Sequence, residues 1–283
     1  MQLIKDKEFE GERPLFASHD LHIDNVTIGE GESAIKECSN ILATKCRFRG
    51  KYPFWHVHGL TIENCSFEAG SRAALWYSDN MKMRNTVVDS PKMFREMENL
   101  KLENVVVNDA SEVFWLCNGV EARDIKLYGG MYMFMYSKNI YITGMEVESK
   151  YIFQYVKNAE IRNSRIKARD SFWEVENVTV YDSILDGEYL GWHSNNLRLV
   201  NCHICGEQPL CYARNLILEN CTFDASCDRA FEYSTLNADI RGEIVNIKNP
   251  SSGRIVADSI GSVTIDENIK APADCTIERR KRK

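Results

Sequence analysis

Tryptophan, tyrosine and histidine recur at one place in a sequence repeat, where they could bind a ligand. The positions are four and five residues before the first apolar residue of each repeat, and we expect them to point outward in two rows. The candidate ligand-binding residues are Trp55, His56, Trp76, Tyr77, Trp115, Tyr136, Tyr155, Trp173, Trp192 and Tyr212. Flat amphipathic rings bury area at low entropic cost and stack on sugar rings. The rows therefore indicate an outer groove for an elongated carbohydrate, such as an oligosaccharide or a sugar acid.

Two other interpretations of the rows stay open. A soluble protein seldom exposes a large apolar stripe without something to cover it. Loops of the same chain could cover the rings. Alternatively, a partner protein or a second copy could dock on them, which would make the chain a non-catalytic structural or interaction module.

Three clusters of charged residues beside the rows are candidates for catalysis. They are Glu174 with His193, Asp170 with Glu188, and Arg95 with Glu96. Carboxylates about 5–9 Å apart are what glycoside hydrolysis needs. A lysine or arginine base would suit β-elimination from an acidic sugar. Each cluster is equally explained as a surface ion pair, so the sequence leaves open whether the chain is a lyase, a hydrolase, an isomerase or no enzyme.

The repeat itself decides the architecture. Its apolar anchors lie 19 to 21 residues apart and are Leu21, Ile41, Leu60, Met81, Leu100, Val120, Ile140, Ala159, Val178, Leu197 and Leu216, with a degenerate copy expected at Ala238. Apolar residues alternate after each anchor, which predicts a strand. A second alternating segment, three to seven residues before each anchor, also predicts a strand.

Short strands in coils of about twenty residues predict an all-β, single-stranded, right-handed parallel β-helix of about twelve coils. The series shows no linker. We therefore expect one domain over 1–283, with an N-terminal cap at 1–14, coils at 15–265 and a C-terminal tail at 266–283.

Asparagine and cysteine occupy structural places in this repeat. Asparagine stands before most anchors and again at a bend four residues later, where it tolerates left-handed backbone and can pair from coil to coil. Gly59, Gly119 and Gly144 replace it. Cys46 with Cys65, and Cys202 with Cys221, fill one inward position on adjacent coils, and we expect small buried fillers there. Because Cys202 and Ile204 point inward, we expect no zinc knuckle at 202–205 and no metal or other cofactor.

Composition limits the partners. The net charge of −6 does not suggest a nucleic-acid binder, and the one basic run, at 279–283, is expected to be a solvated tail. The first residues have no apolar signal segment, and no stretch is apolar enough to span a membrane. Ten cysteines without a signal segment favour reduced thiols, so we expect a cytoplasmic protein, with a homo-oligomer left open.

Several strings also resemble a known family. They are FEGERPLF at 9–16, KYPFW at 51–55, GEYLGWHS at 187–194, QPLCY at 208–212 and FEYS at 231–234. They resemble a bacterial family of uncharacterised single-domain β-helix proteins, known only as a domain of unknown function, within the pectin-lyase-like superfamily. The resemblance implies the fold and no activity. Of the motifs typical of polygalacturonases only Arg165-Ile166-Lys167 occurs, so a standard pectinase is not expected.

Overall fold

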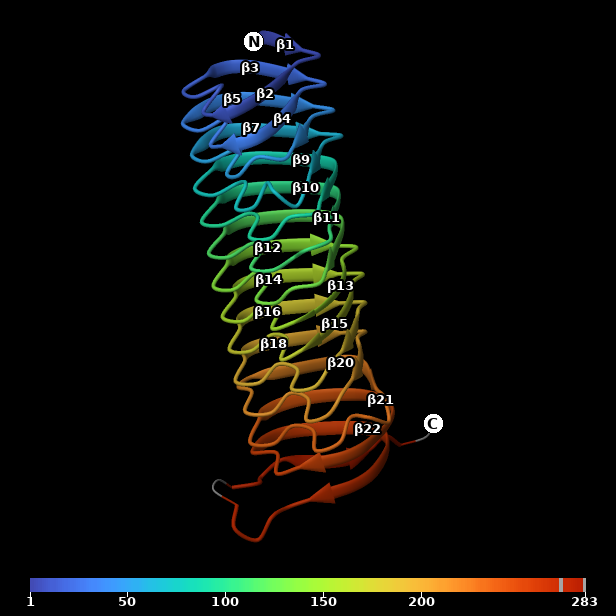
Figure 1. Cartoon of the computed structure of the whole chain (residues 1–283). Helices are drawn as coiled ribbons and strands as arrows, with labels where there is room; N and C mark the ends of the chain where they lie inside the picture. The colour runs from blue at the N-terminus through green and yellow to red at the C-terminus, as the bar shows by residue number, and fades with distance from the viewer. Residues whose placement is uncertain (270–271, 282–283) are drawn as a thin grey trace. The chain divides into compact units, whose positions relative to one another are not determined.

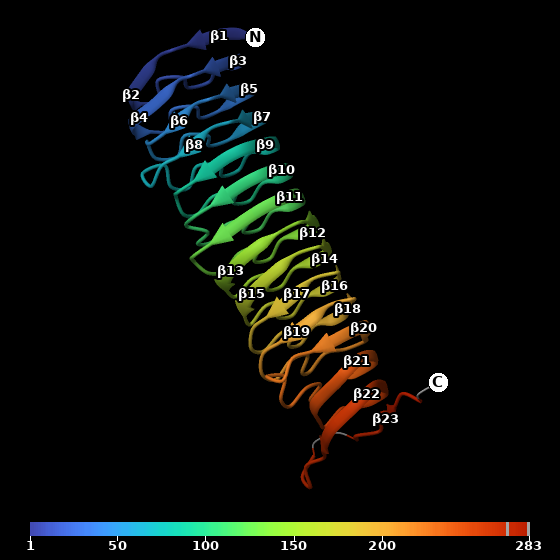
Figure 2. The same cartoon turned by 90° about the vertical axis from the view of Figure 1, so that its right-hand side faces the viewer.

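A computed structural model describes residues 1–269 and 272–281. The chain forms two compact units, Met1–Glu146 (unit 1) and Val147–Lys283 (unit 2). Within the described residues every regular element is a strand, and each unit is a right-handed parallel β-helix (Figures 1 and 2). No helix in the described ranges is long and apolar enough to cross a membrane.

Unit 1 contains the first twelve strands, and β13 (Glu146–Lys150) spans the boundary in the sequence. The twelve strands are β1 (Gln2–Lys5), β2 (Glu8–Glu12), β3 (His19–Asp24), β4 (Thr27–Glu32), β5 (Cys38–Thr44), β6 (Arg47–Phe48), β7 (Val57–Glu63), β8 (Ser66–Phe67), β9 (Asp79–Val88), β10 (Glu98–Val107), β11 (Asn118–Tyr128) and β12 (Lys138–Thr143).

Unit 2 contains the remaining strands. They are β14 (Lys157–Arg162), β15 (Arg165–Arg169), β16 (Glu176–Tyr181), β17 (Ile184–Asp186), β18 (Asn195–Val200), β19 (His203–Cys205), β20 (Leu216–Phe223), β21 (Thr235–Lys248), β22 (Ser252–Thr264) and β23 (Thr276–Arg279). In both units each strand pairs in parallel with the equivalent strand of the next coil, as expected for a β-helix.

The strand register confirms the anchors but corrects their last member. Leu100 pairs with Val120 in unit 1, and Val178 pairs with Leu197 in unit 2. Leu216 pairs with Leu236, however, so the anchor expected at Ala238 is wrong by two residues. The asparagine before Ala238 imitated the repeat, but it lies in extended strand β21 and lacks the positive φ of the other asparagines.

The described residues form about fifteen turns rather than about twelve. The added turns come from β1, β22 and β23, which pair with β3, β21 and β22. β1 and β2 lie in the segment expected to cap the N-terminal end, and β23 lies in the expected tail, of which 270–271 and 282–283 are outside the described residues. Arg280, from the basic run, forms an ion pair with Asp258 at 2.6 Å and is therefore not simply solvated.

The second alternating segment is not a strand, which corrects the expectation. Every second residue there is left-handed, as in Lys92, Phe94 and Glu96, whose φ angles are 60°, 56° and 51°. Backbone hydrogen bonds still join the coils; for example, Glu96 N donates to Trp115 O at 2.9 Å. Alternating handedness and extended backbone both repeat every two residues, so the hydrophobic pattern cannot distinguish them.

Parts of the core consist of stacked side chains of one kind. Phe114 packs against Phe94 and Phe134 with ring centroids 4.6 and 4.5 Å apart and planes within 10°. The paired cysteines are buried and free, as predicted, and Cys46 N donates to Cys65 Sγ at 3.3 Å. In these stretches, residues of one type follow one another on adjacent coils.

The asparagine ladders are confirmed on the surface. Asn196 has a φ of 55°; its amide donates to Asn177 Oδ1 at 2.8 Å and accepts from Asn215 at 3.1 Å. The three glycines that replace asparagine have φ angles of 70° to 75°. The backbone requirement for left-handed residues thus explains both residue types.

Candidate functional site

The two outward rows are present on both units. Residues six and three places before the anchors are buried, and residues five and four places before them are mostly half-buried or exposed. Gln154 and Cys211 are exceptions, because both are buried. All five tryptophans are half-buried, so neither full exposure nor complete cover by loops describes them.

In unit 1 the five-before row forms one continuous stack. The Lys36 ammonium lies 5.3 Å from the Trp55 ring centroid, and Trp55 meets Trp76 edge to face at 5.8 Å. The Arg95 guanidinium lies 4.9 Å from the ring centroids of both Trp76 and Trp115. Each cation of this stack therefore lies against at least one indole ring and is attracted to it through a cation–π contact.

Acidic groups hold Arg95 further in place. Its guanidinium lies 3.6 Å from the Glu96 carboxylate and 3.9 Å from that of Glu112, which also pairs with Lys92 at 3.1 Å. An arginine keeps its proton at ordinary pH. The geometry gives Arg95 and Glu96 structural partners and does not favour Arg95 as a base.

In unit 2 several aromatic rings of the two rows form a column. Trp173 stacks on Trp192 at 5.5 Å, and His193 stacks on Tyr212 at 4.8 Å. Tyr212 continues to Tyr233 at 5.6 Å. The planes of Trp192 and Tyr212 are 63° apart, so the two rings cannot both lie flat across the column. We call these five residues the aromatic column.

Glu174 and His193 follow each other on adjacent coils but have other partners. Glu174 Oε1 accepts a hydrogen bond from Trp173 Nε1 at 3.3 Å, and the His193 ring lies between Trp173 and Tyr212. Among the described residues Glu174 and His193 form no ion pair. Arg95 belongs to unit 1, and Glu174 and His193 belong to unit 2.

Asp170 and Glu188 are brought together beside the aromatic column. Asp170 N donates to Glu188 O at 2.9 Å, and Arg169 Nε lies 3.1 Å from the Asp170 carboxylate and 3.8 Å from that of Glu188. Burial raises the pKa of Asp170 despite Arg169, and Glu188 raises it further. Asp170 is the one carboxyl in the described ranges whose pKa is shown to be raised.

The remaining predicted ligand residues lie along the rows. In unit 1, the Tyr77 ring lies 6.0 Å from that of Trp55, 5.2 Å from that of His56 and 6.1 Å from that of Trp76, so these residues form a cluster of rings. His56 also lies 3.8 Å from the Glu37 carboxylate. Tyr136 is exposed in unit 1, and Tyr155 is half-buried in unit 2.

Sequence reasoning missed three rings. Tyr52 meets Trp55 at 4.9 Å, and Tyr189 meets Trp192 at 5.2 Å, both edge to face. Each tyrosine stands three residues before its tryptophan, so extending the rows by that spacing would have found both. Tyr233 lay beyond the last anchor that defined the rows.

A surface hollow of about 580 Å³ in unit 1 was also not predicted. Its lining residues belong to β7, β9, β10, β11 and β12. Its walls carry matched charges, such as Arg84 with Glu63 at 2.7 Å and Lys101 with Glu121 at 2.7 Å. Because these charged side chains already pair with one another, they leave few unpaired charges for a ligand to bind.

The chain course is similar to that of several solved structures. One is a tailspike protein of the E. coli bacteriophage HK620 in complex with a pentasaccharide, with 10% identity, 92% of this chain and 67% of that chain covered, and a TM-score of 0.35. A periplasmic alginate epimerase has 9% identity, 98% and 74% coverage and a TM-score of 0.33. The catalytic domain of a GH87 α-1,3-glucanase in complex with nigerose has 12% identity, 99% and 63% coverage and a TM-score of 0.31. Likeness at this level does not transfer an activity.

Comparison of sequences places the chain in a family. No curated protein matches it. The sequence model described as "Protein of unknown function (DUF3737)" matches residues 2–278. The chain therefore belongs to the DUF3737 family.

Proposed function

We propose that this DUF3737 protein binds an elongated carbohydrate along the aromatic column of unit 2. The observation that carries the proposal is the column itself, in which half-buried Trp173 and Trp192 continue through His193 to Tyr212 and Tyr233. Successive coils place such rings at the strand spacing of about 4.8 Å. A chain of sugar residues lying along the column could therefore contact several rings in succession.

The chemistry of the column suits a sugar better than an apolar ligand. Sugar rings combine C–H faces, which pack on aromatic rings, with hydroxyl groups that need hydrogen-bond partners. The tilt between Trp192 and Tyr212 leaves part of a ring face uncovered by its neighbour. Exposed Glu174 and Glu188 are hydrogen-bond acceptors for hydroxyls, and His193 can donate or accept.

Asp170 and Glu188 extend the proposal from binding to hydrolysis. Burial raises the pKa of Asp170 although Arg169 lies 3.1 Å from its carboxylate, whereas Glu188 is exposed and lies 3.8 Å from the same arginine. Two carboxyl groups with environments that separate their roles are typical of glycosidases. Asp170 would give its proton to the leaving glycosidic oxygen, and Glu188 would act as the second carboxylate.

Fluorescence titration tests the binding step. The protein is titrated with a panel of oligosaccharides and sugar acids while tryptophan emission is followed. We expect a saturable shift that Trp192→Ala abolishes and Trp115→Ala retains, because Trp115 is equally half-buried but stacks on Arg95 in unit 1. Absence of a saturable shift, or equal loss in both variants, would refute the aromatic column as a carbohydrate site.

Release of reducing ends from any bound oligosaccharide tests the hydrolytic step. Asp170→Asn and Glu188→Gln should each abolish turnover while the fluorescence shift persists. Turnover that survives both substitutions would exclude this pair, and binding without turnover would restrict the function to recognition.

A protein-interaction module is the second candidate, and unit 1 favours it. There the rings are occupied by Lys36 and Arg95, yet the neighbouring row exposes Leu116 and Tyr136 at 45% and 48%. A partner protein or a second copy would cover such apolar surface. Sedimentation at several concentrations should then show association that Leu116→Ser removes, and a constant monomer mass would exclude self-association.

A further inference from the structure

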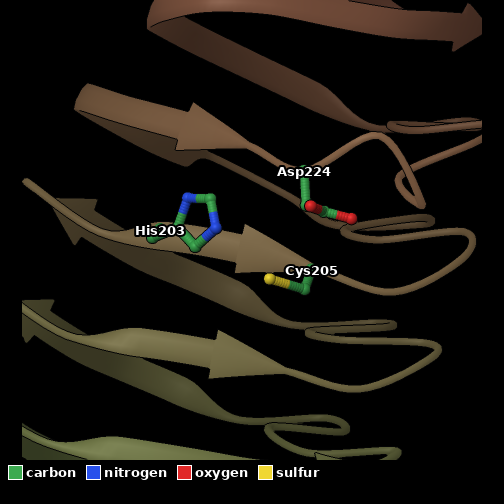
Figure 3. A group of neighbouring side chains, drawn as sticks. All are labelled: His203, Cys205 and Asp224. Atoms are coloured by element: carbon green, nitrogen blue, oxygen red, sulfur yellow. The ribbon is translucent and has the colours of Figure 1, made fainter.

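Three chemically distinct metal-ligating side chains meet on the outer face of unit 2. His203 and Cys205 are two residues apart on β19 and so project from the same side of the strand. β19 pairs with β20 through His203–Thr222 and Ile204–Phe223, so the next residue, Asp224, follows in line with Cys205. The ligand atoms of His203, Cys205 and Asp224 all lie within 4.8 Å of one another (Figure 3).

Neighbouring groups orient two of these ligands. The Nδ1 atom of His203 and the hydroxyl of Thr222 are 2.8 Å apart, which leaves Nε2 as the ring nitrogen available to a metal. The Asp224 carboxylate accepts a hydrogen bond from Ser226 N at 2.9 Å. Metal-binding histidines commonly use their second nitrogen in this way, which holds the ring in position.

The charges around Cys205 favour a cation. Asp186, on β17, pairs with Cys205 in the strand register, so the thiol has a carboxylate residue on the coil before it and another on the coil after it. A divalent cation among these groups would offset their mutual repulsion and stabilise the thiolate.

We propose that His203 Nε2, Cys205 Sγ and the Asp224 carboxylate bind one divalent transition-metal ion of the zinc class. Mixed nitrogen, sulfur and oxygen donors suit zinc better than calcium or magnesium. Binding releases the thiol proton and forms the metal–thiolate bond, with no change in oxidation state. A water molecule completes a fourth position. The inference does not depend on carbohydrate binding.

The geometry needs only a modest adjustment. Zinc–ligand distances of about 2.0–2.3 Å in a tetrahedral site place the ligand atoms about 3.3–3.6 Å apart. The three side chains would therefore move together by about an ångström. Since Cys205 and Asp224 belong to successive coils, the ion would clamp β19 to the segment that follows β20.

Cobalt(II) titration of the metal-free protein tests the site, because a cysteine ligand gives thiolate-to-cobalt charge-transfer absorption. We expect saturable one-to-one binding that zinc displaces. Cys205→Ser should abolish the absorption, and Asp224→Asn should weaken binding by about tenfold or more. Thr222→Val, which removes only the partner of His203, should weaken it by about 10–100-fold.

Matched controls separate the site from chance binding. Cys275 is the other thiol that is only half-buried, and His22 also contacts a threonine on the next coil but has no cysteine two residues later. Cys275→Ser and His22→Ala should leave the titration unchanged, and all variants should keep the wild-type circular dichroism. Absorption that survives Cys205→Ser, or that Cys275→Ser removes equally, would overturn the proposal, as would no saturable binding.

Discussion

Replacement of Asn201 separates the two roles that asparagine has in the surface ladders. The residue is exposed, its φ is 53°, and its amide group donates to Asp182 and accepts from Asn220, both at 2.9 Å. Asn201→Gly removes the two hydrogen bonds but tolerates the left-handed backbone. Asn201→Ala removes the same bonds and also places an ordinary side chain at positive φ.

The expected costs follow from these contributions. Two exposed hydrogen bonds at about 0.5 kcal/mol each contribute about 1 kcal/mol to the free energy of unfolding. Glycine adds about 0.5–1 kcal/mol through the entropy of the unfolded chain, so Asn201→Gly should cost about 1.5–2 kcal/mol. Alanine in left-handed backbone costs about 1–2 kcal/mol, so Asn201→Ala should cost about 2–3 kcal/mol.

Urea unfolding followed by tryptophan emission and by circular dichroism measures both variants. Asn237 is the matched control, because it is also exposed but lies in β21 without a positive φ. There the order should reverse, with glycine less stable than alanine. If Asn201→Ala is as stable as Asn201→Gly, the left-handed requirement does not explain the ladder. The comparison needs coincident transitions by both probes.

Three further predictions concern other parts of the chain. Arg95→Met should lower the free energy of unfolding by about 1–2 kcal/mol, because two cation–π contacts are lost. Double-mutant cycles that combine Arg95→Met with a substitution of Trp76 or Trp115 measure the coupling energy of each contact. Coupling energies near zero would contradict this explanation. Burial raises the pKa of Asp170 above its ordinary 3.8, so its contribution to stability is present below that pH and lost as pH rises through the folded-state value. As the pH rises through this range, the free energy of unfolding of Asp170→Asn should therefore increase relative to that of the wild type. Unfolding curves at several pH values measure both free energies, and a constant difference between them would contradict the prediction. A thiol reagent added to the native, metal-free protein should modify Cys205 and Cys275 first, since the other eight cysteines are buried; mass spectrometry showing an early label elsewhere would contradict the burial.

Much of the fold was predictable because a solenoid repeats its local rules. The apolar anchors recur once per coil, asparagine marks two bends of most coils, and cysteine fills one inward position on two pairs of adjacent coils. The register confirms the anchors from Leu21 to Ile140 in unit 1 and from Ala159 to Leu216 in unit 2. The outward direction of the aromatic rows was also predictable, since residues on either side of them are buried.

The departures from prediction have a common cause. The segment before each anchor alternates in burial whether its backbone is extended or alternately left-handed, so it was interpreted as a strand. Asn237 carried the residue type of the ladder without its backbone conformation, which displaced the last anchor from Leu236 to Ala238. Residue type reports what a position tolerates, whereas hydrogen bonds to the next coil select one of the tolerated conformations.

The candidate site was predictable as a set of residues but not as a set of contacts. Spacing along the chain identified Trp173, Trp192 and Asp170, and it brought Glu188 to the adjacent coil. It could not show that Arg95 is held between two indole rings, because that depends on side-chain directions across three coils.

The sequence by itself determined the parallel β-helix, the inward and outward positions and the asparagine ladders, because each depends on residue type at a fixed period. Only the tertiary structure decided which outward side chains meet. Stacking of coils brings Asp224 into line with Cys205, and it joins Tyr212 to His193, although each pair is 19 residues apart in the chain. Contacts between coils depend on register and rotamer, and these are settled only when neighbouring coils pack against each other.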